Sequence, residues 1–241
     1  MTTALLDAIE FTAGAQPGVP PVASIVVLHG LGADGNDFVP IAQELDLSAI
    51  GPVRFVFPHA PVRPVTLNGG YAMRAWYDLY PPSTVPGVPR REDAPGLRVA
   101  CQQVQALLDR EAALGVPPER TVLMGFSQGC AMALMAGLRA PQRLAGLVGL
   151  SGYLPLAPTT AAERSTANLA TPIFMAHGLH DTVVVPERGS TSRDLLRGLG
   201  HRVDWHAYPM EHSVCMEEVA DLNRWLLAVL STPGAGGAVE A

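Results

Sequence analysis

The sequence predicts an α/β fold in which a mainly parallel, twisted sheet is flanked by helices. Short, largely apolar segments recur along the chain, patterns typical of helices separate them, and turn residues mark the boundaries. Short apolar segments suit strands that are covered on both faces, and their alternation with helices is typical of a parallel sheet. We expect a single domain over residues 1–241, because this length fits one sizeable core and no change of composition divides it.

The predicted strands and helices alternate along most of the chain. The strands are residues 8–12 at one edge of the sheet, 25–28, 54–57, 121–124, 147–150, 173–176 and a late strand at 203–208. The helices are residues 37–47, 97–114, 128–139, 187–199 and 214–230. Residues 128–139 are rich in Ala, Met and Leu on nearly every side, so this helix is expected to be buried.

Two segments stand apart from this alternation. Residues 58–96 hold a predicted hairpin, in which residues 65–67 turn at Asn68-Gly69-Gly70 into residues 71–76 and a Pro-rich loop follows. An excursion of this length is more often functional than idle. The Gly- and Ala-rich tail at residues 231–241 is expected to be disordered.

Bulk composition excludes several classes of function. The net charge of −6, with no local basic cluster, argues against a nucleic-acid partner. The apolar segments are too short to cross a bilayer and no signal peptide or acylation motif is evident, so we expect a cytoplasmic protein without stable membrane association. The chain contains no lysine, which excludes a Schiff-base lysine, a Ser-Lys dyad and a phosphate-binding P-loop. Its three scattered cysteines do not suggest a disulfide framework.

The segment Gly125-Phe126-Ser127-Gln128-Gly129 is the most informative in the chain. It lies between a predicted strand and a predicted helix, where a G-x-S-x-G sequence makes a sharp turn that exposes the serine hydroxyl. The flanking glycines suit a turn that leaves no room for a Cβ atom. We predict that Ser127 is a nucleophile; the alternative is a surface turn that happens to contain serine.

A nucleophilic serine needs a base and a carboxylate that orients the base, and both should lie after later strands in the order Ser, Asp/Glu, His. Asp181 follows the strand predicted at 173–176, and His212 follows the strand predicted at 203–208. We predict His212 as the base and Asp181 as its partner. The alternatives are a surface-loop histidine and a helix-capping aspartate ahead of Pro186.

Attack on a carbonyl creates an oxyanion that needs fixed hydrogen-bond donors. One donor is expected from the N–H of Gln128, at the positive end of the following helix. The loop His29-Gly30-Leu31-Gly32 follows an early strand, and its glycines allow close approach of the backbone, which points to the N–H of Leu31. The alternative is an ordinary Gly-rich turn.

These segments resemble, in order, the phospholipase/carboxylesterase family of α/β-hydrolases, which includes acyl-protein thioesterases and small bacterial carboxylesterases. The segments are LHGLGADGNDF at 28–38, MRAWYD at 73–78, GFSQG at 125–129, LSGYLP at 150–155, His177-Gly178 with Asp181, and His212. The resemblance runs from about residue 25 to residue 230. It implies an α/β-hydrolase fold without a large cap domain, the triad and oxyanion hole given above, and substrates that are carboxylic esters, thioesters of acylated proteins or lysophospholipids.

Two departures from the family pattern bear on the site. Cys130 stands where a glycine is usual, and we interpret it as a packing residue rather than a second nucleophile. Tyr153 stands where a tryptophan is common, which could alter the pocket.

The excursion at residues 58–96 resembles the short, lid-like hairpin that covers the acyl site in this family. The predicted substrate pocket combines this hairpin with residues beyond the strand ends. Met73, Trp76, Tyr153 and Val183 are expected to line it, the first two from the hairpin. The alternative is that these side chains only fix the hairpin to the sheet. His177, His180 and Asp181 could suggest a metal site, but three potential ligands on one loop seldom complete a coordination shell, so we expect no metal and no cofactor.

The sequence therefore predicts a serine carboxylesterase that works through an acyl-enzyme. Acyl-protein thioesterase or lysophospholipase activity is the alternative, and a non-catalytic ligand-binding module on a hydrolase scaffold is a remote one. The expected partner is a small-molecule ester or thioester, and a homodimer is left open.

Overall fold

The computed structural model describes residues 5–85, 87–88 and 90–231. Within them, a seven-stranded sheet has the order β1-β3-β2-β6-β7-β8-β9, in which β1 is antiparallel to β3 and the other neighbouring pairs are parallel. The strands are β1 (Ala8–Ala13), β2 (Ala23–Leu28), β3 (Val53–Pro58), β6 (Thr121–Phe126), β7 (Gly146–Leu150), β8 (Ile173–Gly178) and β9 (Val203–Tyr208). The predicted mainly parallel sheet is confirmed, with its antiparallel strand at the edge.

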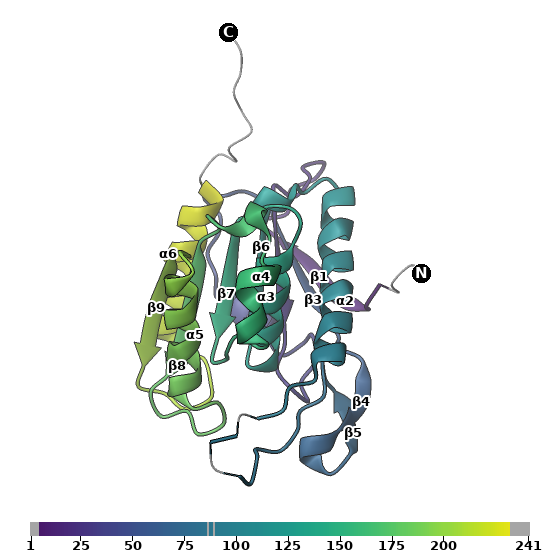
Figure 1. Ribbon diagram of the computed structural model, residues 1–241. Coiled ribbons are helices and arrows are strands. Elements are labelled where there is room, and N and C mark those ends of the chain that lie inside the picture. The colour runs from purple at the N-terminus through teal and green to yellow at the C-terminus, as the bar shows by residue number, and fades with distance from the viewer. Residues whose placement is uncertain (1–4, 86, 89, 232–241) are drawn as a thin grey trace.

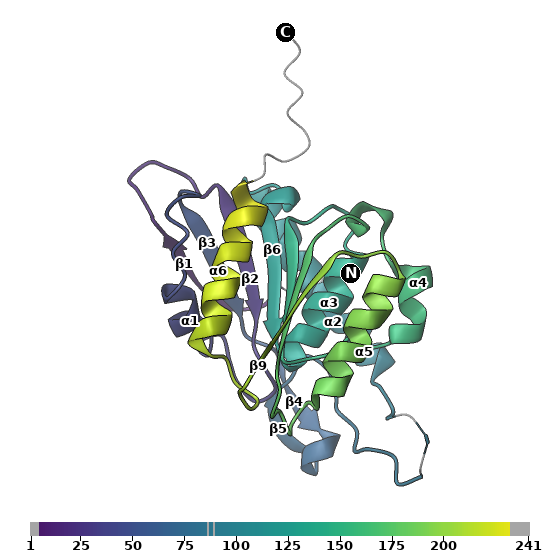
Figure 2. The same cartoon turned by 90° about the vertical axis from the view of Figure 1, so that its left-hand side faces the viewer.

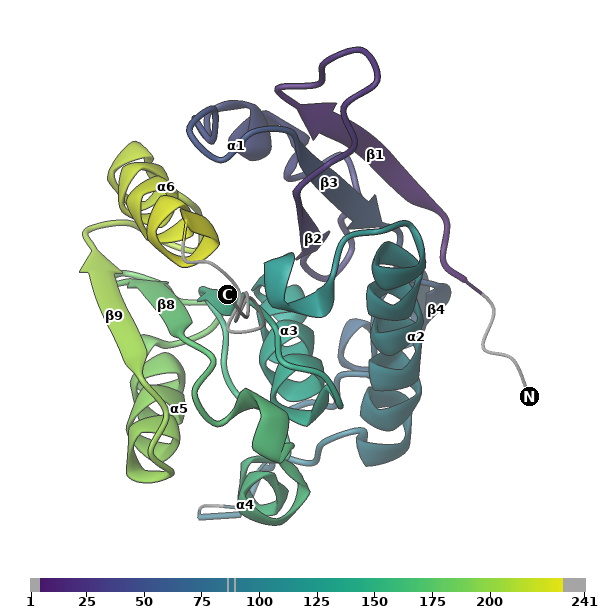
Figure 3. The same cartoon turned by 90° about the horizontal axis from the view of Figure 1, so that it is seen from above.

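Helices cover both faces of this sheet, as Figure 3 shows from above. The short α1 (Val39–Gln43) and α6 (Met216–Ser231) lie on one face, and α2 (Ala94–Ala113), α3 (Gln128–Arg139) and α5 (Pro186–Gly198) lie on the other. The alternation of side chains along a strand creates the two cores. In β2, for example, Ile25 faces the core under α6, whereas Val26 faces the core under α3.

The parallel strands all end at one edge of the sheet, at the lower end of the molecule in Figures 1 and 2. A two-stranded hairpin, β4 (Val62–Val65) and β5 (Tyr71–Arg74), lies at the same end. Its strands are joined by the 3-10 turn η1 (Thr66–Asn68). Functional side chains on the loops after β2, β6, β8 and β9 can therefore meet beside the hairpin.

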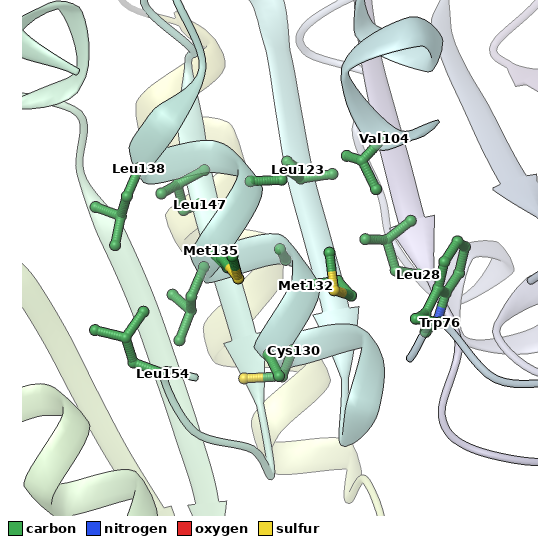
Figure 4. Packing of buried hydrophobic residues seen from close by; sticks show 14 of the residues in the cluster. Leu28, Trp76, Val104, Leu123, Cys130, Met132, Met135, Leu138, Leu147 and Leu154 are labelled. Atoms are coloured by element: carbon green, nitrogen blue, oxygen red, sulfur yellow. The ribbon is translucent and has the colours of Figure 1, made fainter. Parts of the chain in front are cut away.

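Helix α3 forms the centre of one core. Every residue from Gln128 to Leu138 is buried, as its composition predicts. Figure 4 shows Met132 and Met135 of this helix among Leu28, Leu123 and Leu147 of the sheet. The residue that immediately precedes α3, Ser127, is consequently held by a rigid, fully packed element.

Several element boundaries differ from the prediction for identifiable reasons. Helix α1 is shorter than predicted, because residues 34–37 form turns and Pro40 fits only the first turn of a helix. Helix α2 begins earlier, because the Asp93 side chain accepts a hydrogen bond from Gly96 N and caps the helix ahead of Pro95. The first hairpin strand also lies earlier than predicted, with Pro64 on a free edge. The short elements α4 (Thr160–Glu163), η2 (Pro118–Arg120), η3 (Ala157–Thr159) and η4 (Thr166–Asn168) were not predicted.

The predicted disordered tail lies outside the described residues from 232 onward, and Ser231 is the last residue of α6. Among the described helices, none has the length and apolarity needed to cross a bilayer.

Glu218, in the first turn of α6, is fully buried. Within the described part of the chain, neither of its carboxyl oxygens has a hydrogen-bond partner. Burial raises its pKa from the ordinary value of 4.5 to about 8. The folded protein therefore binds a proton here that the unfolded chain releases, and stability falls as pH rises from 4.5 through 8.

We expect Glu218→Gln to be more stable than the wild type at pH 8, by about 3 kcal/mol, and to match it near pH 5. Glutamine has the shape of the protonated carboxyl and carries no ionisable proton. Urea unfolding at the two pH values measures the difference, with the exposed neighbour Glu217→Gln as control. An equal stability difference at both pH values would contradict the assignment of the titration to Glu218.

Candidate active site

Ser127 occupies a strained turn between β6 and α3. Its φ of 55° and ψ of −115° lie in a region that a non-glycine residue rarely adopts. The two glycines of the motif explain how the turn closes. A Cβ on Gly125 would lie 2.1 Å from the carbonyl oxygen of Gly129, and a Cβ on Gly129 would lie 2.0 Å from the carbonyl oxygen of Leu28. Both contacts are with backbone, which cannot swing aside.

Gly129→Ala is therefore expected to destabilise the fold by about 3 kcal/mol or more, because the new methyl must push β2 and α3 apart. Gly198→Ala, at the end of α5, is the matched control, since a Cβ there meets no other part of the described chain within 4 Å. The control should be neutral or slightly stabilising. Thermal unfolding of both variants measures the effect, and equal stability of the two would contradict the steric explanation of the motif.

The structure brings the three predicted catalytic side chains into one hydrogen-bonded chain. His212 Nε2 lies 2.9 Å from Ser127 Oγ, and His212 Nδ1 lies 2.7 Å from Asp181 Oδ2. The Nδ1–H donates to the carboxylate, which leaves Nε2 as the acceptor for the serine hydroxyl. The Phe126 ring packs against the imidazole, with centroids 4.9 Å apart. The geometry thus pairs a hydroxyl with an oriented base.

Asp181 is fixed independently of His212. Its side chain is buried, and Oδ1 accepts hydrogen bonds from the N–H groups of Val183 at 2.9 Å and Val184 at 2.8 Å. His177 Nε2 donates to the carbonyl of Val184 and lies 3.3 Å from Asp181 Oδ2. The carboxylate therefore presents one oxygen to the imidazole while the other is held by the backbone.

Leu31, in the loop of residues 29–32 after β2 (the oxyanion loop), and Gln128, the first residue of α3, line the same cavity as Ser127. Neither of their backbone N–H groups has a protein acceptor in the described part of the chain. His29 holds the loop: its Nε2 accepts from Ala60 N at 3.0 Å, and its Nδ1 donates to Gly30 O at 2.7 Å. Burial lowers the pKa of His29, which keeps this ring neutral. These two unoccupied donors fit the predicted oxyanion hole.

The sequence predicts that Trp76 lines the pocket, but it is absent from the cavity lining. It is fully buried, and Figure 4 shows it beside Leu28 in the core. Its Nε1 donates to His29 O at 2.9 Å, and its backbone N–H donates to the Gln128 side-chain oxygen at 2.9 Å. Trp76, just after β5, therefore joins the oxyanion loop to the first residue of α3. Its indole N–H lies in the core because a buried N–H needs an acceptor, here His29 O.

Gln128 contributes a side chain as well as a backbone N–H. Its Nε2 donates to Tyr77 O at 2.9 Å, which completes the connection between α3 and the segment after β5. Met73 does not line the pocket either. It lies beside Gly32, where its sulfur accepts from Asn68 Nδ2 at 3.3 Å.

A cavity of about 300 Å³ opens beside Ser127. Tyr153 and Val183 line it, as the sequence predicts. Much of its lining is apolar, with Leu31, Leu67, Leu79, Phe126 and Val183. Sequence reasoning missed Leu67 and Phe126, although Phe126 stands inside the nucleophile motif, and it also missed Arg90 and Arg188. The arginines lie on a loop and on a helix that no motif marks.

Two other sequence interpretations concern residues next to the triad. Cys130 is fully buried, and burial raises the pKa of its thiol, so it behaves as the predicted packing residue.

Within the described residues no group of three or more histidine, cysteine or acidic side chains has the arrangement of a metal site. His177 instead contacts Asp181 and the backbone, as described above.

The geometry can be compared with known proteins. The model of the phospholipase/carboxylesterase family matches residues 12–230. Acyl-protein thioesterase 1 of Yarrowia lipolytica is 38% identical over 208 residues, which are 85% of this chain and 90% of that protein. Acyl-protein thioesterase 1 of Gibberella zeae is 36% identical over 231 residues, 94% of this chain and 97% of that protein.

Solved structures agree with the sequence comparison. The chain is similar to Arabidopsis thaliana SOBER1, with a TM-score of 0.80 and 32% identity over 86% of this chain and 99% of that one. It is also similar to Zea mays acyl-protein thioesterase 2, with a TM-score of 0.78 and 30% identity over 92% of this chain and 99% of that one. With this fold and these relatives, the chain belongs to the phospholipase/carboxylesterase family of α/β-hydrolases.

Proposed function

We propose that this chain hydrolyses carboxylic esters through an acyl-enzyme formed on Ser127, with His212 as general base and Asp181 as its orienting partner. The observation that carries the proposal is the continuous chain of contacts from Ser127 Oγ to His212 Nε2 and from His212 Nδ1 to Asp181 Oδ2. The family and its relatives make the chain a hydrolase that acts on esters or thioesters.

The reaction begins when His212 Nε2 takes the proton of Ser127 Oγ as the oxygen attacks the substrate carbonyl carbon. The carbonyl oxygen becomes an oxyanion, which accepts hydrogen bonds from the backbone N–H groups of Leu31 and Gln128. His212 then gives its proton to the departing alcohol or thiol. Water repeats the sequence on the acyl-enzyme and regenerates Ser127. Asp181 holds the imidazole in the tautomer that has Nε2 free and stabilises the imidazolium ion.

The alternative activity within this mechanism is acyl-protein thioester hydrolysis. This alternative is supported by the relatives named acyl-protein thioesterase. The carbonyl chemistry is the same for sulfur and oxygen leaving groups. Lysophospholipid hydrolysis is the other alternative, in keeping with the family's name. A non-catalytic binding module is disfavoured by the presence and contact of all three triad side chains.

A panel of 4-nitrophenyl esters and matched acyl thioesters, with acyl chains from two to sixteen carbons, tests the proposal on the purified protein. We expect turnover of short and medium esters, since a cavity of about 300 Å³ has room for a chain of modest length. Selective turnover of long-chain thioesters would favour the thioesterase alternative. Binding without turnover of any member would support the non-catalytic module.

A further inference from the structure

The substrate cavity continues away from the triad into a more polar region. A second cavity of about 430 Å³ shares six lining residues with the cavity beside Ser127: Tyr77, Leu79, Arg90, Tyr153, Val183 and Arg188. Ser127, His212 and Leu31 line only the first cavity. Both arginines therefore belong to the part of the lining that the two cavities share.

Both guanidinium groups lack an acidic partner in the part of the chain that the structure describes. Arg188, in the first turn of α5, stacks on the Tyr153 ring with its Cζ 3.4 Å from the centroid. Arg90 uses its Nε to donate to the carbonyl of Tyr80 at 2.5 Å. Its Nη2 is buried and finds no hydrogen-bond partner among the described residues. A buried charged donor without an acceptor is costly, which indicates that a ligand supplies the acceptor.

Two tyrosine hydroxyls lie in the same wall. Tyr77 Oη and Tyr153 Oη are 3.0 Å apart and buried. Only one of their two protons is used in the hydrogen bond between them, so the second remains available to an acceptor in the cavity. Burial raises the pKa of Tyr77 far above its ordinary value, so its hydroxyl stays a neutral donor.

Two carboxylates that line the second cavity are held by other groups. Asp78 accepts from the backbone N–H of Thr66 at 2.7 Å and from its hydroxyl at 2.6 Å. Glu92 accepts from the Leu156 N–H at 3.1 Å. Neither carboxylate forms an ion pair with Arg90 or Arg188, so both guanidinium groups keep hydrogen-bonding capacity for a ligand.

We propose that Arg188 and Arg90 select substrates in which the acyl or the alcohol part carries an anionic oxygen group, a carboxylate or a phosphate. A guanidinium group binds both anions through paired N–H donors, and the tyrosine hydroxyl pair adds a further donor. The proposal rests on the proposed ester hydrolysis and names its substrate class. The scissile carbonyl lies at Ser127, and the anion lies against the part of the lining that the two cavities share.

Two pairs of substrates locate the anion. The acyl pair is 4-nitrophenyl hydrogen glutarate and the neutral 4-nitrophenyl pentanoate. The alcohol pair is 1-butyrylglycerol 3-phosphate and the neutral 1-butyrylglycerol. We expect kcat/KM to favour the anionic member by about tenfold or more in at least one pair, because a charge-assisted hydrogen bond contributes this much. The pair that shows the preference tells which side of the ester carries the anion.

Arg188→Gln should lower the ratio of anionic to neutral kcat/KM by about tenfold or more, and Arg188→Lys should retain part of the preference. Arg193→Gln is the matched control. Arg193 also lies on α5 and stacks on an aromatic ring, that of Trp205, but it is outside both cavities and pairs with Asp194. In Arg193→Gln the ratio of anionic to neutral kcat/KM should equal that of the wild type.

The ratio separates recognition from folding, because a merely misfolded variant loses turnover of both members of a pair. Equal kcat/KM within both pairs in the wild type would overturn the anion proposal while leaving ester hydrolysis intact. A preference that survives the double variant Arg90→Gln/Arg188→Gln would overturn it as well. Absence of turnover of all four substrates would overturn both the anion proposal and the proposed function.

Discussion

Ser127→Ala is expected to lower kcat for ester hydrolysis by about 10⁶-fold, because the attacking oxygen is lost and the remaining groups only position the substrate. The variant should stay folded. The only side-chain hydrogen bond of Ser127 among the described residues is the one to His212, and alanine tolerates the same backbone turn at a similar cost. Steady-state kinetics with 4-nitrophenyl butyrate and a thermal unfolding curve check both parts.

Ser151→Ala is the matched control for this variant. Ser151 is also a serine with positive φ, 46°, at the end of the neighbouring strand β7, and it is buried. Its hydroxyl has no hydrogen-bond partner among the described residues, so its removal should leave kcat within about twofold of the wild type. A Ser127→Ala variant with activity close to that of Ser151→Ala would refute the assignment of the nucleophile.

Asp181→Asn is expected to lower kcat by about 10⁴-fold, a loss of the size seen when the carboxylate of such a triad becomes an amide. The asparagine oxygen can still accept from the Val183 and Val184 N–H groups, so the loop should keep its shape. The amide NH₂ then faces His212 Nδ1 and favours the tautomer that has its proton on Nε2. That tautomer cannot accept the proton of Ser127.

The control for this charge removal is Asp204→Asn. Asp204 lies on β9 with Oδ1 3.3 Å from His206 Nε2, which makes a second histidine–aspartate pair outside the site. Its kcat should be unchanged. A loss of less than about tenfold in Asp181→Asn, in a folded protein, would mean that another group orients His212.

The fold could be predicted from the sequence where periodicity and length agree. The strand at Val203–Tyr208 and the helix at Gln128–Arg139 have the predicted bounds, since apolar patterning dominates in both. The meeting of Ser127, Asp181 and His212 could also be predicted, because the carboxyl ends of parallel strands share one edge. Each of these residues lies just beyond such a strand end.

The hairpin side chains could not be predicted in the same way. Met73 lies on the short strand β5 and Trp76 lies just after it, and so short a segment does not tell which side chain faces the cavity and which faces the core. The indole of Trp76 is drawn inward by the carbonyl of His29, an acceptor that appears only once the oxyanion loop has folded. Arg90 and Arg188 are close together only in space, one on the loop after the hairpin and one on α5. Such pairings depend on tertiary structure and leave no local signal in the sequence.

The most direct measurement is the site at which a fluorophosphonate, an analogue of the acylating ester, becomes covalently attached. Trypsin releases residues 121–139 as one peptide, in which Ser127 is the only serine. We predict one label per chain, carried by that peptide in the wild type and absent from Ser127→Ala. A label on any other peptide, or no label on a folded wild-type protein, would contradict the claim that His212 and Asp181 activate Ser127 for attack.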